Sequence, residues 1–262
     1  MDRVLRVDLN SDMGEGFGRY RLGADEALLA VVSSANVACG FHAGDPSQMR
    51  RTVALARNRG VSVGAHPGYP DLVGFGRREM KVDPSEVEDL VVYQVGAMAG
   101  VARAEGVELT HVKPHGALYN QAARDKSLAR AVARAIKSVD PHLALVGLFG
   151  SELGAVGREE GLRVVEEVFA DRAYLSDGRL APRELPGALV TEPPIVAERA
   201  LRMIREGRVS AIDGGCIRVR ADTICIHGDT AGAPALAAAV RTRLEAAGVR
   251  IVGLQRKSET AP

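Results

Sequence analysis

Four of the six histidines in this chain of 262 residues follow short apolar runs and stand in turns that contain glycine or proline. The segments NVACGFHAGDP, VSVGAHPGYPD, LTHVKPHGALYN and ICIHGDTAGA place His42, His66, His115 and His227. A residue where a parallel strand ends and a loop begins lies at the edge of the sheet where α/β proteins build their sites. We therefore expect the four imidazoles to gather at one rim, where they could accept and donate protons.

Acidic and amide side chains alternate in the N-terminal segment VDLNSDMGEGFG. Asp8, Asn10 and Asp12 share one face wherever this segment is extended, and Glu15 follows in a glycine-rich turn. Carboxylates this close repel one another unless a metal, a proton or a cationic ligand lies among them. A solvated loop with Asx turns is the alternative interpretation for such a cluster taken alone.

The segment KPHGALYN is the richest in chemistry. Lys113 stands in an apolar run, and a buried ammonium is costly unless it meets an anion. His115 and Tyr119 follow it. His111 and His115 have the spacing of two metal ligands on a helix, but Pro114 between them argues against a helix, so we do not interpret them as a zinc-protease motif.

Further ionisable residues lie near the same predicted strand ends. Asp45 precedes a proline and suits the N-cap of the next helix. The segment GFGRR offers Arg77 and Arg78 as clamps for an anion. The segment FADRAY offers Asp171 and Arg172, and HGDT offers Asp229. Each alone also fits a solvated surface, a buried salt bridge or a turn cap. Together they describe a site of histidines, carboxylates and a lysine that suits general acid–base hydrolysis.

A rim of this kind needs strands that alternate with helices, and the hydrophobic periodicity predicts them. Short apolar runs predict strands at residues 4–9, 34–38, 61–65, 110–113, 143–148, 163–167, 209–213 and 223–227, with a further short strand at 250–254. Helical patterns, several of which begin at proline and end at glycine, predict helices at residues 46–59, 84–105, 117–138, 193–206 and 233–247.

This alternation predicts a mostly parallel sheet. An open sheet would concentrate the polar residues at one switch point, whereas here they follow almost every strand. We therefore expect an α/β fold with a single domain over residues 1–254, a (β/α) barrel or a distorted barrel, and a polar tail at 255–262. Residues 170–190 lack a clear period, which is typical of an inserted loop or lid.

Composition narrows the class of protein. Apolar residues make up 46% of the chain, and the net charge of +1 gives no reason to expect nucleic acid or an anionic membrane as a partner. The odd number of cysteines, three, argues against a disulfide framework and favours a reducing cytoplasm. We expect no signal peptide and no membrane span. The Gly-Lys pair of a P-loop is absent, so a nucleotide would bind through another device or on another subunit.

Six segments together resemble the LamB/YcsF family: DLNSDMGEGFG, NVACGFHAGDP, GAHPGYPDLVGFGRR, KPHGALYN, EVFADRAY and ICIHGDT. They lie in one order between residues 7 and 230. The resemblance implies the activity of a bacterial ATP-dependent 5-oxoprolinase, in which opening of the lactam ring of 5-oxoproline (pyroglutamate) to L-glutamate is coupled to ATP hydrolysis. It also implies assembly with 5-oxoprolinase subunits B and C, and a barrel similar to those of sugar deacetylases and glycoside hydrolases.

The implied reaction suggests roles for the motif residues. A lactam has an inert carbonyl and a poor nitrogen leaving group, and phosphorylation of its oxygen, assigned largely to the partner subunits, would activate the carbon. We expect Asp12 or His66 to be the base and His115 to pass a proton to nitrogen. Lys113 would stabilise negative charge. The residues expected to bind substrate, with an arginine on its carboxylate, are Asp8, Asn10, Glu15, His42, Asp45, Arg77, Tyr119, Asp171, Arg172, His227 and Asp229.

Two other functions remain open. A metal-dependent deacetylase or amidohydrolase would use His42, His66 and either Asp12 or Asp8 as ligands, because an aspartate and two histidines can hold zinc with an open position. A non-catalytic subunit would bind a lactam or carbohydrate and present it to a partner. The main interpretation assigns no metal ligand, and it leaves the need for a divalent metal undecided.

Overall fold

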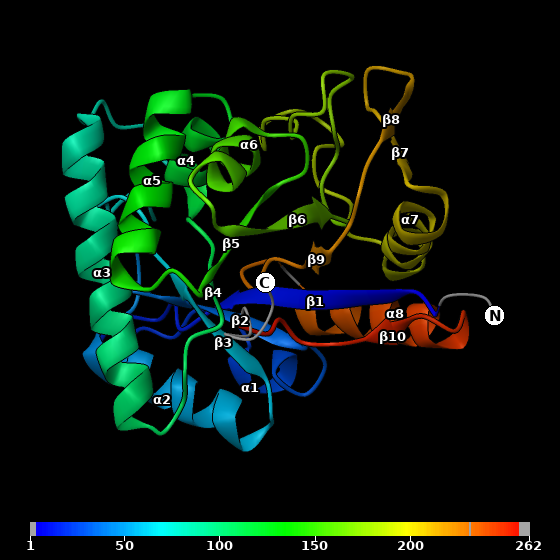
Figure 1. Ribbon diagram of the computed structural model, residues 1–262. Coiled ribbons are helices and arrows are strands. Elements are labelled where there is room, and N and C mark those ends of the chain that lie inside the picture. Colours follow the sequence, from blue (N-terminus) through cyan, green and yellow to red (C-terminus); the bar gives the residue numbers. More distant parts are fainter. Residues whose placement is uncertain (1–3, 231, 257–262) are drawn as a thin grey trace.

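Seven parallel strands close into a barrel within residues 4–230 and 232–256, the part of the chain that the computed structural model describes (Figure 1). In order around the barrel they are β1 (Arg6–Met13), β2 (Ser34–Ala38), β3 (Ser62–His66), β4 (His111–Val112), β5 (Ala144–Leu148), β6 (Arg163–Phe169) and β9 (Thr223–Cys225). Pairing of β9 with both β6 and β1 closes the ring. A short strand, β10 (Arg250–Ile251), pairs with the start of β1. The predicted α/β barrel is confirmed.

Helices cover the outside of this barrel. They are α1 (Asp25–Leu28), α2 (Pro46–Asn58), α3 (Pro84–Ala104), α4 (Gly116–Ala122), α5 (Lys126–Val139), α6 (Glu152–Glu159), α7 (Pro193–Glu206) and α8 (Ala233–Ala246). Helix α5 packs between α3 and α6, and α7 packs on α8 at the other side of the barrel (Figure 1). Among the described residues, no helix combines the length and the apolar character needed to cross a membrane.

Strand β1 shows how the fold separates two environments. Leu9 and Met13 are fully buried in the main hydrophobic core. Asp8, Asn10 and Asp12 alternate with them and hydrogen-bond to side chains of neighbouring strands, so they face the barrel interior. The strand runs on past the predicted end at residue 9, and the three polar residues therefore share one face.

Helix α2 begins as its sequence predicts. The carboxylate of Asp45 accepts hydrogen bonds from the backbone N–H groups of Ser47 at 2.8 Å and Gln48 at 3.0 Å. A third backbone N–H, from Gly18, donates to its other oxygen at 2.8 Å. Asp45 is thus an N-cap that also fixes the loop after β1.

The predicted barrel strand at 209–213 is wrong. Strand β7 (Arg208–Ser210) instead pairs antiparallel with β8 (Cys216–Arg218) in a separate hairpin. At its turn Gly214 and Gly215 have φ of 97° and 89°, in the left-handed region that glycine adopts at little cost. The Asp-Gly-Gly sequence between two short runs is a local hairpin signal, and it outweighs the apolar pattern.

The single helix predicted at 117–138 is two helices, α4 and α5. The side chain of Asp125 accepts from the backbone N–H groups of Ser127 at 2.8 Å and Leu128 at 3.2 Å, which starts α5 anew. Such a cap inside a long helical pattern marks a break. Helix α6 was not predicted, since its two glycines weaken the helical pattern.

The predicted polar tail at 255–262 lies outside the described residues from residue 257 onward. Its second residue, Arg256, donates to the backbone oxygen of Leu109 at 3.1 Å and pairs with Asp140 at 2.7 Å. The chain is therefore anchored to the barrel up to that point.

Candidate active site

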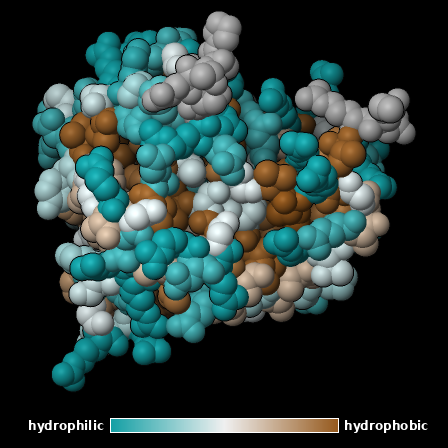
Figure 2. Space-filling view, turned by 60° about the horizontal axis from the view of Figure 1, so that its bottom comes forward, coloured by the Kyte–Doolittle hydropathy of each residue, from teal (hydrophilic) through white to brown (hydrophobic). Residues whose placement is uncertain are grey.

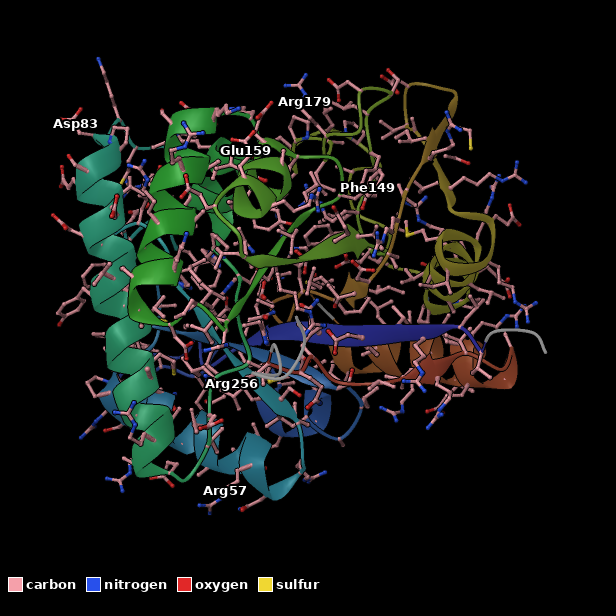
Figure 3. All side chains as sticks on the ribbon, in the orientation of Figure 1. Arg57, Asp83, Phe149, Glu159, Arg179 and Arg256 are labelled. Atoms are coloured by element: carbon pink, nitrogen blue, oxygen red, sulfur yellow. The ribbon has the colours of Figure 1, made fainter. Side chains whose placement is uncertain are left out.

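A cavity of about 810 Å³ opens at the carboxyl ends of the barrel strands. Residues 170–190, the segment predicted as a loop or lid, form one of its walls. In Figure 3 two residues of the cavity wall, Phe149 and Arg179, lie in the upper half of the molecule, and Arg57 lies at the opposite end. The predicted site residues that line the cavity are Asp12, His66, Arg77, Lys113, His115, Tyr119, Arg172 and His227.

The floor of the cavity contains a lysine cluster, which we define as Asn10, Asp12, Lys113 and Glu167. Lys113 is only 3% exposed, and its Nζ lies 3.0 Å from Asp12 Oδ1 and 3.0 Å from Glu167 Oε1. Asn10 Oδ1 accepts from the same ammonium at 3.4 Å and its amide donates to Glu167 at 3.0 Å. The expectation that a buried lysine meets an anion is confirmed.

Charges in the lysine cluster stabilise one another against burial. Burial opposes the charge of Lys113, but its neighbours, Asp12 foremost, hold its pKa well above the ordinary value. Burial likewise opposes the charge of Asp12, and the nearby His66 and Lys113 outweigh it, so the pKa of Asp12 lies well below the ordinary value. Asp12 is therefore an anion and Lys113 a cation at neutral pH.

Next to it lies a histidine cluster, which we define as Glu15, His42, His66 and His115. His66 Nε2 faces His115 Nδ1 at 2.9 Å, and Glu15 Oε1 lies 3.8 Å from the same Nδ1. The ring of His42 stacks on that of His115 with centroids 3.8 Å apart and planes 4° apart. His66 Nε2 also lies 3.4 Å from Asp12 Oδ2, which joins the two clusters.

Burial sets the protonation of the histidine cluster. It lowers the pKa of His42 and of His115 well below the ordinary value, with the neighbouring histidines adding to the effect. Burial and the charge of Asp12 raise the pKa of Glu15 well above its ordinary value. These three groups therefore favour their neutral forms when nothing cationic lies among them.

The loop after β3 presses its backbone against these rings. Gly76 has φ of 62°, and a Cβ there would lie 2.6 Å from His42 Cβ and 2.9 Å from His115 Cδ2. Phe75 has φ of 54°, a conformation that a residue with a side chain rarely adopts, and its carbonyl accepts from His115 Nε2 at 2.8 Å. Backbone strain at this position therefore serves to orient an imidazole.

Cationic groups surround the mouth of the cavity. Arg77 pairs with Asp229 at 2.7 Å. Arg172 is 6% exposed and donates to the backbone oxygen of Ala181 at 2.7 Å. Burial, together with the charge of Arg183, lowers the pKa of Arg172 to about 10. These guanidinium groups favour an anionic ligand.

His227 and Asp171 form a pair at the side of the cavity, with His227 Nδ1 3.0 Å from Asp171 Oδ2. Burial opposes the charge of Asp171, but His227 and its hydrogen bonds bring the pKa below its ordinary value. Tyr119, also in the cavity wall, donates its hydroxyl to Glu167 at 2.7 Å. Both contacts orient side chains in the cavity wall.

Seven predicted site residues do not line the cavity. Five of them contact residues that do: Asn10, Glu15, His42, Asp171 and Asp229. The other two lie farther away. Asp45 caps α2, as described above. Asp8 is 2% exposed deeper in the barrel, where it accepts from Ser34 at 2.6 Å and Thr223 at 2.6 Å. Burial raises the pKa of Asp8 to about 6 in spite of these hydrogen bonds.

Sequence reasoning missed three residues of the site: Asn36, Phe75 and Glu167. The amide of Asn36 donates to both Asn10 at 2.7 Å and Asp12 at 2.8 Å. Glu167 is fully buried in β6. A charged residue within an apolar run is the signal that indicated Lys113, and Glu167 shows the same signal. Nothing in the sequence indicates the positive φ of Phe75.

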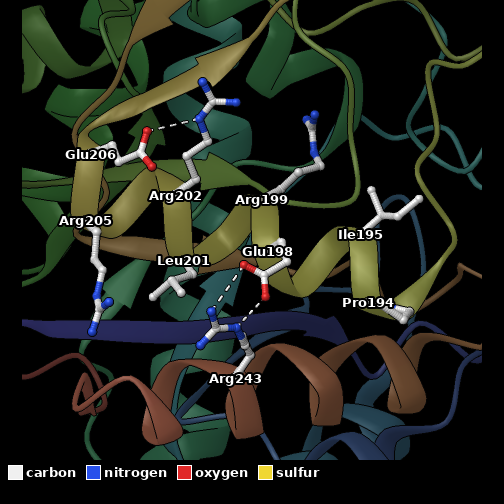
Figure 4. Close-up of a pocket in the computed structure, with 9 residues that line it drawn as sticks. All are labelled: Pro194, Ile195, Glu198, Arg199, Leu201, Arg202, Arg205, Glu206 and Arg243. Atoms are coloured by element: carbon white, nitrogen blue, oxygen red, sulfur yellow. Dashed lines mark hydrogen bonds and ion pairs between the residues drawn. The ribbon is translucent and has the colours of Figure 1, made fainter.

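A second groove, on the described helices α7 and α8, has a different chemistry. This groove of about 650 Å³ is lined by charged side chains that pair with each other, Glu198 with Arg243 and Arg202 with Glu206 (Figure 4). On the face in Figure 2, apolar side chains gather in patches separated by polar ones. The strand-end cavity is therefore the candidate site.

Comparison with known proteins agrees with the motifs at this rim. The LamB/YcsF family model matches residues 7–259. The chain belongs to this family. A relative from Syntrophobacter fumaroxidans, named as the A subunit of 5-oxoprolinase, is 54% identical over 250 residues, which cover 95% of this chain and 99% of the relative.

Solved structures of a similar protein and of a more distant one share the barrel. A lactam utilization protein from Thermus thermophilus is 54% identical, covers 95% of this chain and all of its own, and has a TM-score of 0.91. A protein from Enterococcus faecalis described as a cellobiose-phosphate cleavage protein is 12% identical and has a TM-score of 0.57 over 96% of this chain and 98% of its own. The second likeness concerns the fold alone.

Proposed function

We propose that this chain is the A subunit of an ATP-dependent 5-oxoprolinase, which opens 5-oxo-L-proline to L-glutamate in the cytoplasm together with subunits B and C. Full-length relatives with more than half of their residues identical carry the name of this subunit. The observation in the site that carries the proposal is the anionic Asp12 beside His66 and Lys113 at the floor of a cavity with a cationic mouth.

The floor suits the hydrolytic half of the reaction. Once the lactam oxygen is phosphorylated at the expense of ATP, water attacks the ring carbon and its proton passes to the Asp12–His66 pair, whose atoms are 3.4 Å apart. The carbon–nitrogen bond breaks as nitrogen takes a proton from His115, which leaves an acyl phosphate. A second water then hydrolyses this acyl phosphate to the side-chain carboxylate of glutamate and inorganic phosphate. Lys113 stabilises the negative charge that develops on oxygen.

The mouth suits the substrate and its activated form. Both carry negative charge, on the carboxylate and on the phosphate. Arg77 and Arg172 line the cavity and have N–H groups that can bind either anion. ATP itself is a co-substrate that we assign to the partner subunits, because the chain lacks a P-loop.

The test is ATP hydrolysis that depends on 5-oxoproline, measured with this chain, with subunits B and C, and with all three. We expect turnover only from the complete set. Asp12→Asn should lower kcat by about 10²- to 10⁴-fold, the usual contribution of a positioned base.

The matched control is Asp125→Asn, which alters an N-cap outside the cavity and should leave kcat unchanged. Full turnover from subunits B and C alone, or from the complex with Asp12→Asn, would argue for a subunit that only presents the substrate.

A further inference from the structure

We propose that the histidine cluster is a binding site for one divalent transition-metal ion of the zinc type, with Glu15, His42, His66 and His115 as its ligands. One ligating atom of each residue lies within 4.8 Å of those of the other three. Three imidazoles and a carboxylate are the donors that zinc and its neighbours prefer.

Hydrogen bonds fix the tautomers of two rings. His66 Nδ1 lies 2.6 Å from the carbonyl oxygen of Lys113, and His115 Nε2 lies 2.8 Å from that of Phe75. A carbonyl oxygen only accepts, so both ring nitrogens carry a hydrogen. Metal-bound histidines are oriented in the same way, by an outer N–H that donates to a backbone carbonyl.

The inner nitrogens then lack a partner. In the neutral rings His66 Nε2 and His115 Nδ1 are both acceptors, yet they face each other at 2.9 Å. Two lone pairs at this distance repel, and a cation between or beside them removes the repulsion. A proton on His66 Nε2, beside the anionic Asp12 at 3.4 Å, would also do so, but it would leave both ring nitrogens of His42 without a partner among the described residues.

His42 and Glu15 favour the ion over the proton. His42 is 1% exposed, and neither of its ring nitrogens has a hydrogen-bond partner among the described residues. Its ring is parallel to that of His115, so it must turn about the Cβ–Cγ bond to reach a common ion, and this turn breaks no hydrogen bond. Glu15, buried beside them at 6% exposure, supplies a negative charge once a cation is present.

A neighbouring group of possible ligands is already neutralised. Asp12, Cys225 and His227 also have ligating atoms within 4.8 Å of one another. However, Lys113 Nζ lies 3.0 Å from Asp12 Oδ1 and 3.0 Å from Cys225 Sγ, so an ammonium takes the place of an ion there. The ion is therefore expected in the histidine cluster alone.

The role of the ion rests on the proposed function, whereas its binding does not. With the ion bound, His66 and His115 are both ligands, so Asp12, 3.4 Å away from the His66 nitrogen, is left as the group that takes the proton from water and returns it to nitrogen. The ion would supply Lewis-acid activation of water or of the lactam carbonyl.

The experiment measures metal binding to the isolated full chain, after removal of any affinity tag and treatment with a chelator, without ATP, 5-oxoproline or partner subunits. We expect one Zn²⁺ per chain by calorimetry and elemental analysis. One Co²⁺ per chain should give the visible absorption bands of a site with nitrogen and oxygen ligands. Glu15→Gln and His42→Gln should each weaken Zn²⁺ binding by about a hundredfold or more, since even outer-shell changes cost 10- to 100-fold.

Two controls separate this site from adventitious binding. His142→Gln alters a histidine outside both clusters, and Cys216→Ser removes an exposed thiol, so neither should change the affinity. Thermal unfolding confirms that each variant folds. Absence of a bound ion, or binding that Glu15→Gln and His42→Gln leave unchanged, would overturn the proposal. If the unmodified chain binds Zn²⁺ but the complex with subunits B and C shows no 5-oxoprolinase activity, the proposed function fails and the metal site stands.

Discussion

The lysine cluster and the histidine cluster lie side by side at the floor of one cavity. They differ in whether the folded chain alone gives their polar groups a partner. In the lysine cluster the ammonium of Lys113 has a carboxylate at 3.0 Å on each of two sides. In the histidine cluster two acceptor nitrogens face each other at 2.9 Å, and a third imidazole, that of His42, has no hydrogen-bond partner among the described residues. The first cluster is complete in the folded chain, and the second is complete only with a cation.

This difference separates what the protein stabilises by itself from what it prepares for a ligand. A buried charge pair is retained because removal of either member leaves the other unpaired. A group of buried neutral ligands destabilises the ligand-free protein, and binding of the ion then stabilises the folded state. The contrast can be tested by removing charge from each cluster in turn.

Removal of the ammonium should have the largest effect. Lys113→Met keeps the length of the side chain but leaves Asp12 and Glu167 as buried, unpaired carboxylates. We expect a loss of about 3–5 kcal/mol in the free energy of unfolding, measured with urea, and loss of 5-oxoprolinase turnover in the complex.

Lys126→Met provides the control, since its ion pair with Glu159 is exposed and should contribute about 1 kcal/mol or less. Equal stability of the two variants would mean that the lysine cluster is not held together by its charges.

Asp8 provides an intermediate case, a carboxylate with hydrogen bonds but no cation. Its folded-state pKa of about 6 lies above the ordinary value of 3.8, so its contribution to stability is full below about pH 4 and is lost as the pH rises through 6. About two pKa units correspond to about 3 kcal/mol. Asp8→Asn should abolish this loss between pH 4 and pH 7 in urea unfolding, and parallel pH profiles of the two proteins would contradict it.

Neutralisation of the histidine cluster should have the smallest effect and the opposite sign. Burial raises the pKa of Glu15, so at pH 8 the unfolded chain exposes this carboxylate to water as an anion, whereas the metal-free folded protein must keep it protonated or bury its charge, and either costs stability. Glu15→Gln should therefore stabilise the metal-free protein at pH 8 by about 1–2 kcal/mol, the scale of one unsatisfied buried group. With saturating Zn²⁺ the unmodified protein should instead have the higher Tm of the two in thermal unfolding. If Glu15→Gln instead destabilised the metal-free protein, the carboxylate of Glu15 would already be stabilised by its surroundings, as the charges of the lysine cluster are.

The sequence predicted the barrel because its signals are local. Apolar runs that alternate with helical patterns indicate strands and their covering helices wherever the chain places them. Where the structure differs from the prediction, an equally local signal decides the outcome. The glycines of the turn at residues 214–215 and the cap at Asp125 each outweigh the hydrophobic pattern around them.

The sequence by itself determined which chemical groups the rim would contain. Histidines, carboxylates and Lys113 follow the strands in order, and parallel strands bring their carboxyl ends to one edge. Eight of the predicted residues line one cavity for this reason.

Only the tertiary structure decided which of these groups are partnered. Glu167 reaches Lys113 across the barrel, from a strand more than fifty residues away in the sequence. The strained carbonyl of Phe75 fixes the tautomer of His115 and leaves its other nitrogen facing His66. Hydrogen bonds and charge pairs depend on distances of a fraction of an ångström between distant segments, and closure of the barrel sets those distances.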